Sequence, residues 1–146
     1  MKRALVLGVA AALAVTWSTG YVQGQGKQTE KKSLIFVSAD KAKFTEMRPG
    51  NSRAVLWEDP ESGSGGFFAK MNPGFDAGIH THTNDVWLVV IKGAYLYKDD
   101  AGEKRVGPGS FLRIPGGMKH WSGGDAKEGA LFYGESSGKF DLVPAK

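Results

Sequence analysis

Short runs of apolar and β-branched residues, separated by turn-forming residues, recur along the chain beyond its N-terminal segment. The runs are rich in Val, Ile, Phe, Tyr and Trp, which favour strands. They cover residues 34–37, 53–57, 66–71, 78–82, 86–91, 94–98, 111–114 and 130–133. Turn signals such as Asn72-Pro73-Gly74 and Gly107-Pro108-Gly109 lie between them, and no segment has sustained helical periodicity. This pattern predicts an all-β sandwich or barrel.

The size and composition of the chain limit it to one folded domain. Its 146 residues are 41% hydrophobic, which is enough for a single core. The 21 glycines and 6 prolines suit tight turns between short strands. We therefore expect one β domain and no internal repeat.

The N-terminus has the three-part pattern of a secretory signal. Met1-Lys2-Arg3 supplies the positive start, an apolar run extends from Ala4 to Trp17, and small and polar residues follow without a charge. The run is shorter than the roughly 20 apolar residues that a spanning helix needs. We predict a signal peptide at about residues 1–24, a polar tail at 25–32 and the domain at 33–146. The protein is then exported, periplasmic or secreted, with no membrane span in its mature form.

Charge and cysteine content narrow the possible partners and ligands. The formal net charge is +4, and it becomes smaller when Lys2 and Arg3 leave with the signal peptide. The sequence has no cluster of basic residues of the kind that binds nucleic acid. A nucleic-acid partner is therefore not expected. Because the chain has no cysteine, disulfides and thiolate ligands are excluded, and a metal would bind through His, Asp or Glu.

Three histidines, all that the chain contains, form a spaced set. His80 and His82 are two positions apart in a predicted strand, so both side chains project from the same face. His120 follows the Pro115-Gly116-Gly117 turn, and closure of a barrel would bring it beside the pair. Lone histidines more often bond to neighbours or to solvent, but this spacing favours a metal site.

The chain resembles the cupin family in two motifs. Gly74, His80, His82 and Gly93 stand in the register of the first cupin motif, and Gly109, Pro115, Gly117 and His120 stand in that of the second. The resemblance implies a double-stranded β-helix, a jelly-roll barrel, with the three histidines as ligands of one divalent metal ion.

Two positions depart from the cupin pattern. Val86 stands where the first motif usually has a glutamate ligand, and Gly124 replaces the asparagine of the second motif. The chain is therefore similar to cupins of the three-histidine type. Asp85 is the candidate for an additional ligand, although strand alternation would point it away from the side of Val86. Val86 and Tyr97 are candidates for the pocket wall.

The resemblance leaves two functions open. Three-histidine dioxygenases of the family use non-haem iron, so the leading hypothesis is a metal-dependent dioxygenase that acts on a small molecule. Fe(II) is the favoured ion, while Zn, Ni, Cu and Mn also accept imidazole ligands. The alternative is a non-catalytic periplasmic cupin that binds or senses a metal or a small ligand. Because cupins commonly pair, we also predict a homodimer formed through the outer sheet or through a strand at 34–37.

Overall fold

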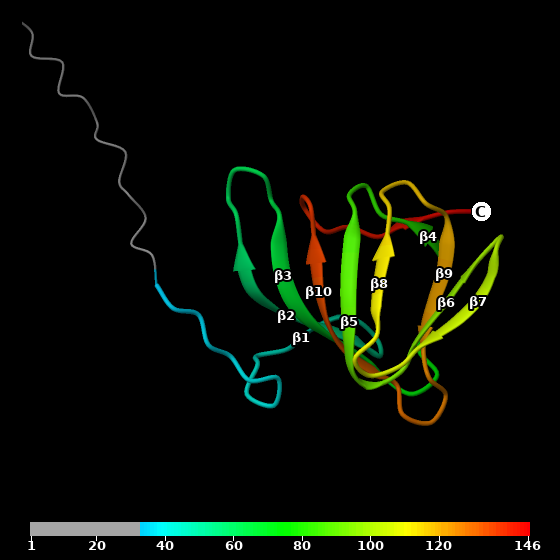
Figure 1. The fold of residues 1–146 in the computed structure, drawn as a ribbon, viewed down its shortest axis with the longest axis horizontal. Coiled ribbons are helices and arrows are strands. Elements are labelled where there is room, and N and C mark those ends of the chain that lie inside the picture. The colour runs from blue at the N-terminus through cyan, green and yellow to red at the C-terminus, as the bar shows by residue number, and fades with distance from the viewer. Residues whose placement is uncertain (1–32) are drawn as a thin grey trace, which may run out of the picture. The chain divides into compact units, whose positions relative to one another are not determined.

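Antiparallel strands form the whole regular structure of the part of the chain that we describe, residues 33–146 of a computed structural model (Figure 1). The predicted signal peptide and polar tail lie outside the described residues. No helix in the described part is long and apolar enough to cross a membrane. The strands are β1 (Thr45–Arg48), β2 (Asn51–Glu58), β3 (Gly65–Met71), β4 (Asp76–Thr81), β5 (Val86–Gly93), β6 (Tyr95–Asp99), β7 (Gly102–Val106), β8 (Phe111–Ile114), β9 (His120–Gly124), β10 (Ala130–Ser136) and β11 (Val143–Pro144).

The strands form two facing sheets. One has the order β1-β2-β3-β10-β5-β8, and the other has the order β11-β4-β9-β6-β7. Strands distant in sequence are neighbours in each sheet, such as β3 and β10, which pair over their full lengths. This arrangement is the double-stranded β-helix of cupins, so the predicted all-β jelly-roll fold is confirmed.

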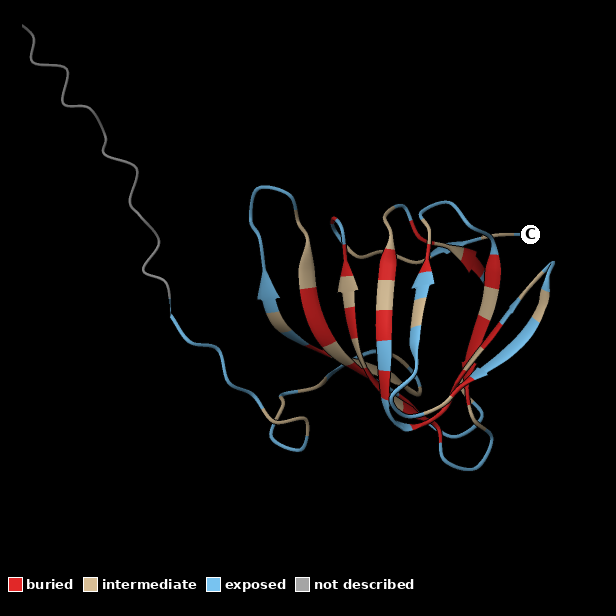
Figure 2. Ribbon diagram, in the orientation of Figure 1, coloured by how far each residue is buried: buried red, intermediate tan, exposed pale blue. Residues whose placement is uncertain are grey.

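Side-chain alternation places the core between the two sheets. In β10 every second residue is buried, and in β5 Val86, Leu88 and Val90 are buried while Val89 and Ile91 are exposed. Figure 2 shows these buried bands on the strands that enclose the core. Since apolar burial is the main favourable term in folding, this alternation fixes which face of each strand lines the interior.

The predicted strands agree with the structure except at residues 34–37. Leu34, Ile35, Phe36 and Val37 form no strand, and all four side chains are exposed, with Leu34 at 94%. A strand needs a hydrogen-bonding partner, and within the described residues this segment pairs with none. The prediction of a strand there was wrong for the single chain.

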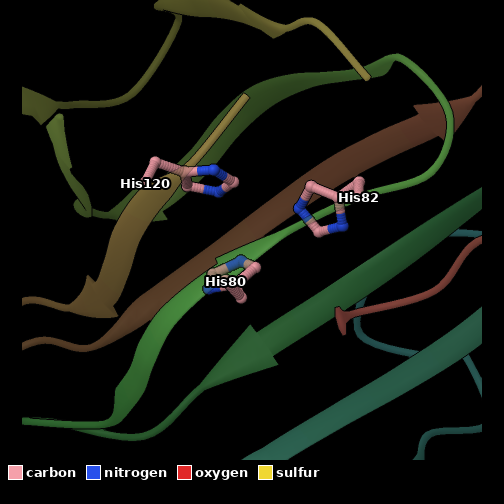
Figure 3. A group of neighbouring side chains, drawn as sticks. All are labelled: His80, His82 and His120. Carbon is pink, nitrogen blue, oxygen red and sulfur yellow. The ribbon is translucent and has the colours of Figure 1, made fainter. Parts of the chain in front are cut away.

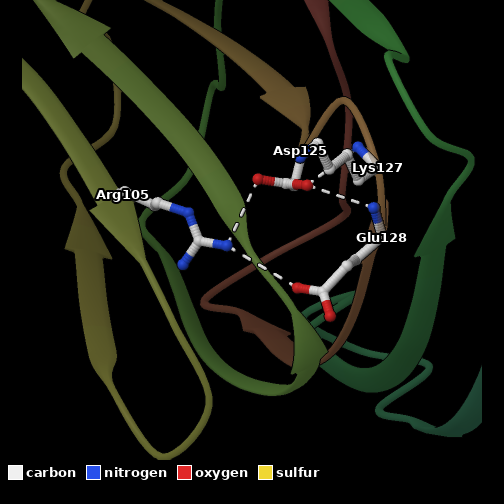
Figure 4. A network of polar contacts seen from close by, with 4 residues as sticks. All are labelled: Arg105, Asp125, Lys127 and Glu128. Carbon is white, nitrogen blue, oxygen red and sulfur yellow. Dashed lines mark hydrogen bonds and ion pairs between the residues drawn. The ribbon is translucent and has the colours of Figure 1, made fainter.

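The turn between β9 and β10 is held by a polar network (Figure 4). One oxygen of Asp125 accepts the backbone N–H groups of Lys127 at 2.9 Å and Glu128 at 3.1 Å. Arg105 of β7 donates to the other oxygen of Asp125 at 3.2 Å and lies 3.7 Å from the Glu128 carboxylate. Exposed ion pairs stabilise little, so the network mainly shapes the turn and ties it to β7.

Candidate metal centre

Two strands and one loop bring the three histidines together. His80 in β4 is the direct cross-strand partner of His120 in β9. His82 follows Thr81, the last residue of β4, and projects to the same side as His80. All three are buried, with exposed fractions of 4% or less, whereas Ile79, the residue before His80, is 48% exposed. Figure 3 shows the rings grouped around a common space.

Each imidazole is oriented by a backbone carbonyl. Nδ1 of His80 lies 2.9 Å from the carbonyl oxygen of Gly78, Nδ1 of His82 lies 2.6 Å from that of Asp141, and Nδ1 of His120 lies 2.9 Å from that of Met118. A carbonyl oxygen only accepts, so each Nδ1 carries the hydrogen and donates it. The second nitrogen of each neutral ring, Nε2, therefore keeps its lone pair free for another partner.

The free nitrogens fit a single metal ion. One ligand atom from each of the three histidines lies within 4.8 Å of the others. Nε2 of His120 is buried and has no hydrogen-bond partner in the described part of the chain. A buried polar atom without a partner is costly, and ligation of a cation removes that cost. Imidazole nitrogens suit divalent transition metals, and carbonyls that orient such rings are common around metal sites.

Burial keeps the three imidazoles neutral. It lowers the pKa of His80 to about 4, against the opposing effect of the hydrogen bond to Gly78 and with smaller contributions from neighbouring positive charge. Burial is also the largest cause that lowers the pKa of His82 and of His120. At neutral pH all three rings are thus unprotonated at Nε2, which is the form that binds a metal.

The loop after β4, which carries His82, packs closely against the turn before β9, which precedes His120. The backbone N–H of Gly117 donates to the carbonyl of His82 at 2.7 Å. A Cβ atom on Gly116 would lie 2.6 Å from the carbonyl oxygen of Thr83, so only glycine allows this approach. Gly117 itself has a φ of 77°, the left-handed conformation that the turn after Pro115 requires. The glycines of the second motif therefore set the position of His120 relative to His82.

Asp85 braces these loops from outside the cluster of ligand atoms. Its two carboxylate oxygens accept hydrogen bonds from the Gly116 N–H at 2.8 Å and from Nη2 of Arg113 at 2.6 Å. The bond from Gly116, followed by that from Arg113, holds the pKa of Asp85 below its usual value. Among residues 33–146 the three histidines make up the converging group, and Asp85 would have to leave both partners to join it.

The two predicted pocket residues occupy different positions. Val86 is buried and, with His80 and His82, lines a cavity of about 40 Å³. Tyr97 does not line that cavity; its ring stacks on His120 with centroids 5.3 Å apart, and its hydroxyl donates to Asp99 at 2.9 Å. Burial is the main cause that raises the pKa of Tyr97, so its hydroxyl stays protonated. Tyr97 therefore supports His120 from behind.

Several groups at the centre were not anticipated from the sequence. The carbonyl of Asp141 reaches His82 from 59 positions away, and its carboxylate accepts the Thr83 N–H at 2.8 Å. Two cationic residues, Arg48 and Arg53, lie in a larger groove that borders the histidine cavity. The glycines of the two motifs indicated the turns. No feature of the local sequence indicated the long-range partners, because these depend on how distant segments pack.

Comparisons with known proteins agree with this architecture. A family model described as "Domain of unknown function (DUF4437)" matches residues 25–146. No curated protein matches the chain.

Three solved structures illustrate the likeness. KdgF from Halomonas sp. is 19% identical with a TM-score of 0.59, over 72% of this chain and 94% of that chain. An RmlC-like cupin from Shewanella frigidimarina is 17% identical with a TM-score of 0.60, over 73% and 94%. The polyketide cyclase RemF from Streptomyces resistomycificus is 18% identical with a TM-score of 0.64, over 78% and 87%. At these identities the likeness shows the cupin fold alone.

Proposed function

This chain belongs to the DUF4437 family, a family of cupin-type domains, and we propose that it is a metal-dependent enzyme acting on a small molecule. The observation that carries this proposal is the group of three buried imidazoles. Their Nδ1 atoms are engaged by carbonyls, and each ring offers one ligand atom within 4.8 Å of the others. His80, His82 and His120 would hold one divalent ion.

The ligand set determines what the ion supplies. Three neutral imidazoles leave a divalent ion at about +2 in formal charge, so when bound it acts as a stronger Lewis acid than it would beside a carboxylate. The protein residues provide the rest: the Gly78, Met118 and Asp141 carbonyls hold the rings in place. Val86, in the position of the usual cupin glutamate, makes the adjoining wall apolar.

For the reaction we propose dioxygenation with Fe(II) as the metal. An all-imidazole set tolerates Fe(II), and the buried apolar wall beside it suits chemistry that must be protected from water. An enzyme of this class adds both atoms of O₂ to an organic substrate. Zn, Ni, Cu and Mn fit the same ligands, so the metal identity is part of the proposal.

Oxygen uptake tests the reaction. The protein loaded anaerobically with Fe(II) should consume O₂ when offered one of a panel of diketones, thiols and catechols. The same protein loaded with Zn(II), which is redox-inert, is the control and should consume none. If no panel compound causes uptake above the zinc control, the dioxygenase proposal loses its main support.

A second candidate is a non-catalytic module that binds or senses a metal or small ligand. The cavity beside the histidines is only about 40 Å³, and its lining contains no carboxylate that could act as a general base. Tight binding of one metal equivalent without turnover on any substrate would favour this function over the enzyme.

A further inference from the structure

A groove of about 360 Å³ opens beside the histidine cavity. It is bounded by β1, β2, β3 and β10 and by the segment that leads to β11. Its volume lies within the range of sites for small organic ligands. The groove is thus large enough for a substrate that the small histidine cavity does not accommodate.

The groove and the histidine cavity share one wall. Arg48, Phe67, Phe132, Phe140 and Leu142 line both spaces. His82 also contacts the ring of Phe140, with centroids 5.2 Å apart. A molecule that lies in the groove therefore borders the same side chains that surround His80 and His82.

Two arginines place positive charge in this groove. The guanidinium carbon of Arg53 lies 5.4 Å from the ring centre of Phe67 and 5.0 Å from that of Phe140, so the two rings hold it in position. The guanidinium carbon of Arg48 lies 5.5 Å from the ring centre of Phe75. These contacts limit the motion of both side chains and prepare them for a ligand.

Neither arginine forms a close ion pair among residues 33–146, although the charge of Glu58 acts on Arg53 from a longer distance. No ion pair joins Arg48 or Arg53 to a carboxylate there, and Nε of Arg53 is buried without a hydrogen-bond partner. The carboxylate that lines the groove, Asp141, is bonded to the N–H and hydroxyl of Thr83 instead. The groove therefore has two guanidinium groups whose donors are available to an external anion.

We infer that Arg48 and Arg53 bind the carboxylate of a small organic acid, which is the substrate of the three-histidine centre. A guanidinium matches a carboxylate in charge and in planar, bidentate geometry. The aromatic residues Phe67, Phe132 and Phe140 favour an acid with an apolar or unsaturated body. The inference rests on the proposed function, because it assigns the substrate class of the same centre.

Calorimetric titration of the Zn(II)-loaded protein tests this assignment. The probes are benzoate, phenylacetate and phenylpyruvate, each compared with its neutral amide. At least one acid should bind, and its amide should bind about tenfold more weakly or worse, since it lacks the charge that the arginines recognise.

Arginine variants then locate the binding. Arg48→Gln and Arg53→Gln should each weaken binding of the acid by about tenfold or more, with Arg53→Lys intermediate. Arg105→Gln removes a comparable exposed arginine outside the groove and should leave binding unchanged. All variants should retain the metal content of the parent, which shows that they are folded and separates this test from that of the metal centre.

Three outcomes would overturn the carboxylate site: no binding by any acid, equal binding of acids and amides, or unchanged affinity in both glutamine variants. Acid binding that depends on the arginines in a protein that retains no metal would leave the anion site intact and reject the proposed function instead.

Discussion

At the scale of single residues, the candidate metal centre depends on hydrogen bonds at the Nδ1 atom of each imidazole, which leave Nε2 free for a ligand. The carbonyls of Gly78, Asp141 and Met118 select the same tautomer in all three rings. Burial removes the competing protonated form. A histidine cluster with rings free to rotate would have the same composition but would bind a metal much less tightly.

The pH dependence of the metal-free protein follows from this burial. The folded-state pKa of His80, about 4, lies below its ordinary 6.5, so between these values the unfolded chain binds a proton that the folded protein does not. The free energy of unfolding should therefore fall as the pH decreases from about 6.5 to 4, by roughly 2 kcal/mol from His80 after allowance for solvent screening.

Urea unfolding of the chelator-treated protein at several pH values checks this dependence. The His80→Gln variant is the control, and its stability should change less over the same interval. Identical slopes in the two proteins would show that His80 is not held neutral by burial.

Asp85 provides a second test at this scale. We expect Asp85→Ala to retain close to the parental metal content, because its carboxylate bonds to Gly116 and Arg113. The thermal midpoint should fall, since the brace between the two loops is lost. Elemental analysis and thermal unfolding measure the two effects. Metal loss as complete as in His82→Ala would instead identify Asp85 as a ligand.

At the scale of elements, the centre depends on the contact between the loop after β4 and the turn before β9. Gly116→Ala places a Cβ atom 2.6 Å from the Thr83 carbonyl oxygen, so one of the two loops must move. We expect a loss of about 1–3 kcal/mol in unfolding free energy and weaker metal binding.

Gly107→Ala is the matched control for this loop contact. The nearest atom to its added Cβ is the end of Arg105, 3.9 Å away, so the stability should hardly change. Chemical denaturation and metal titration compare the two variants. Equal effects at positions 107 and 116 would contradict the importance of the loop contact.

The sequence predicted the strands that have β-type composition, but it did not predict strands with a different composition that form because a neighbouring strand pairs with them. β5 and β8 have clear β-type composition and were predicted where they occur. β7 is Gly102–Val106 and mostly charged, and β9 contains two glycines. β7 is a strand because β6 pairs with it, and β9 is a strand because β4 and β6 pair with it on either side. The segment 34–37 shows the reverse, since strand-like composition without a partner gave no strand.

The same limit applies to the metal centre. The shared face of His80 and His82 follows from strand alternation, a local rule. The partners that orient the rings, and the arginines of the groove, depend on how distant segments meet. Asp141 and His82, for example, are joined only when the C-terminal segment crosses the end of β4 to form β11.

At the scale of the whole molecule, the exposed apolar residues of 34–37 bear on assembly. Phe36 is 86% exposed, and Phe111 on the edge strand β8 is 64% exposed. Both are unusual for a free surface and favour contact with a second copy. We therefore keep the prediction of a homodimer, in which residues 34–37 become a strand only on pairing.

Sedimentation of the protein at micromolar concentration measures this assembly. We expect the mass of a dimer. Phe36→Asp should weaken it about tenfold or more if residues 34–37 form the contact, whereas Phe111→Asp should do so if the outer sheet does. A single monomer mass for the parent protein would contradict the prediction.

Metal content is the most direct test of the account as a whole. The protein, purified without a histidine tag from its native cells, should contain close to one equivalent of a divalent transition metal, and iron if the dioxygenase proposal holds. The His80→Ala/His82→Ala variant, prepared in the same way and shown to be folded, should contain almost none. Equal metal content in the two proteins, or none in either, would contradict the three-histidine centre.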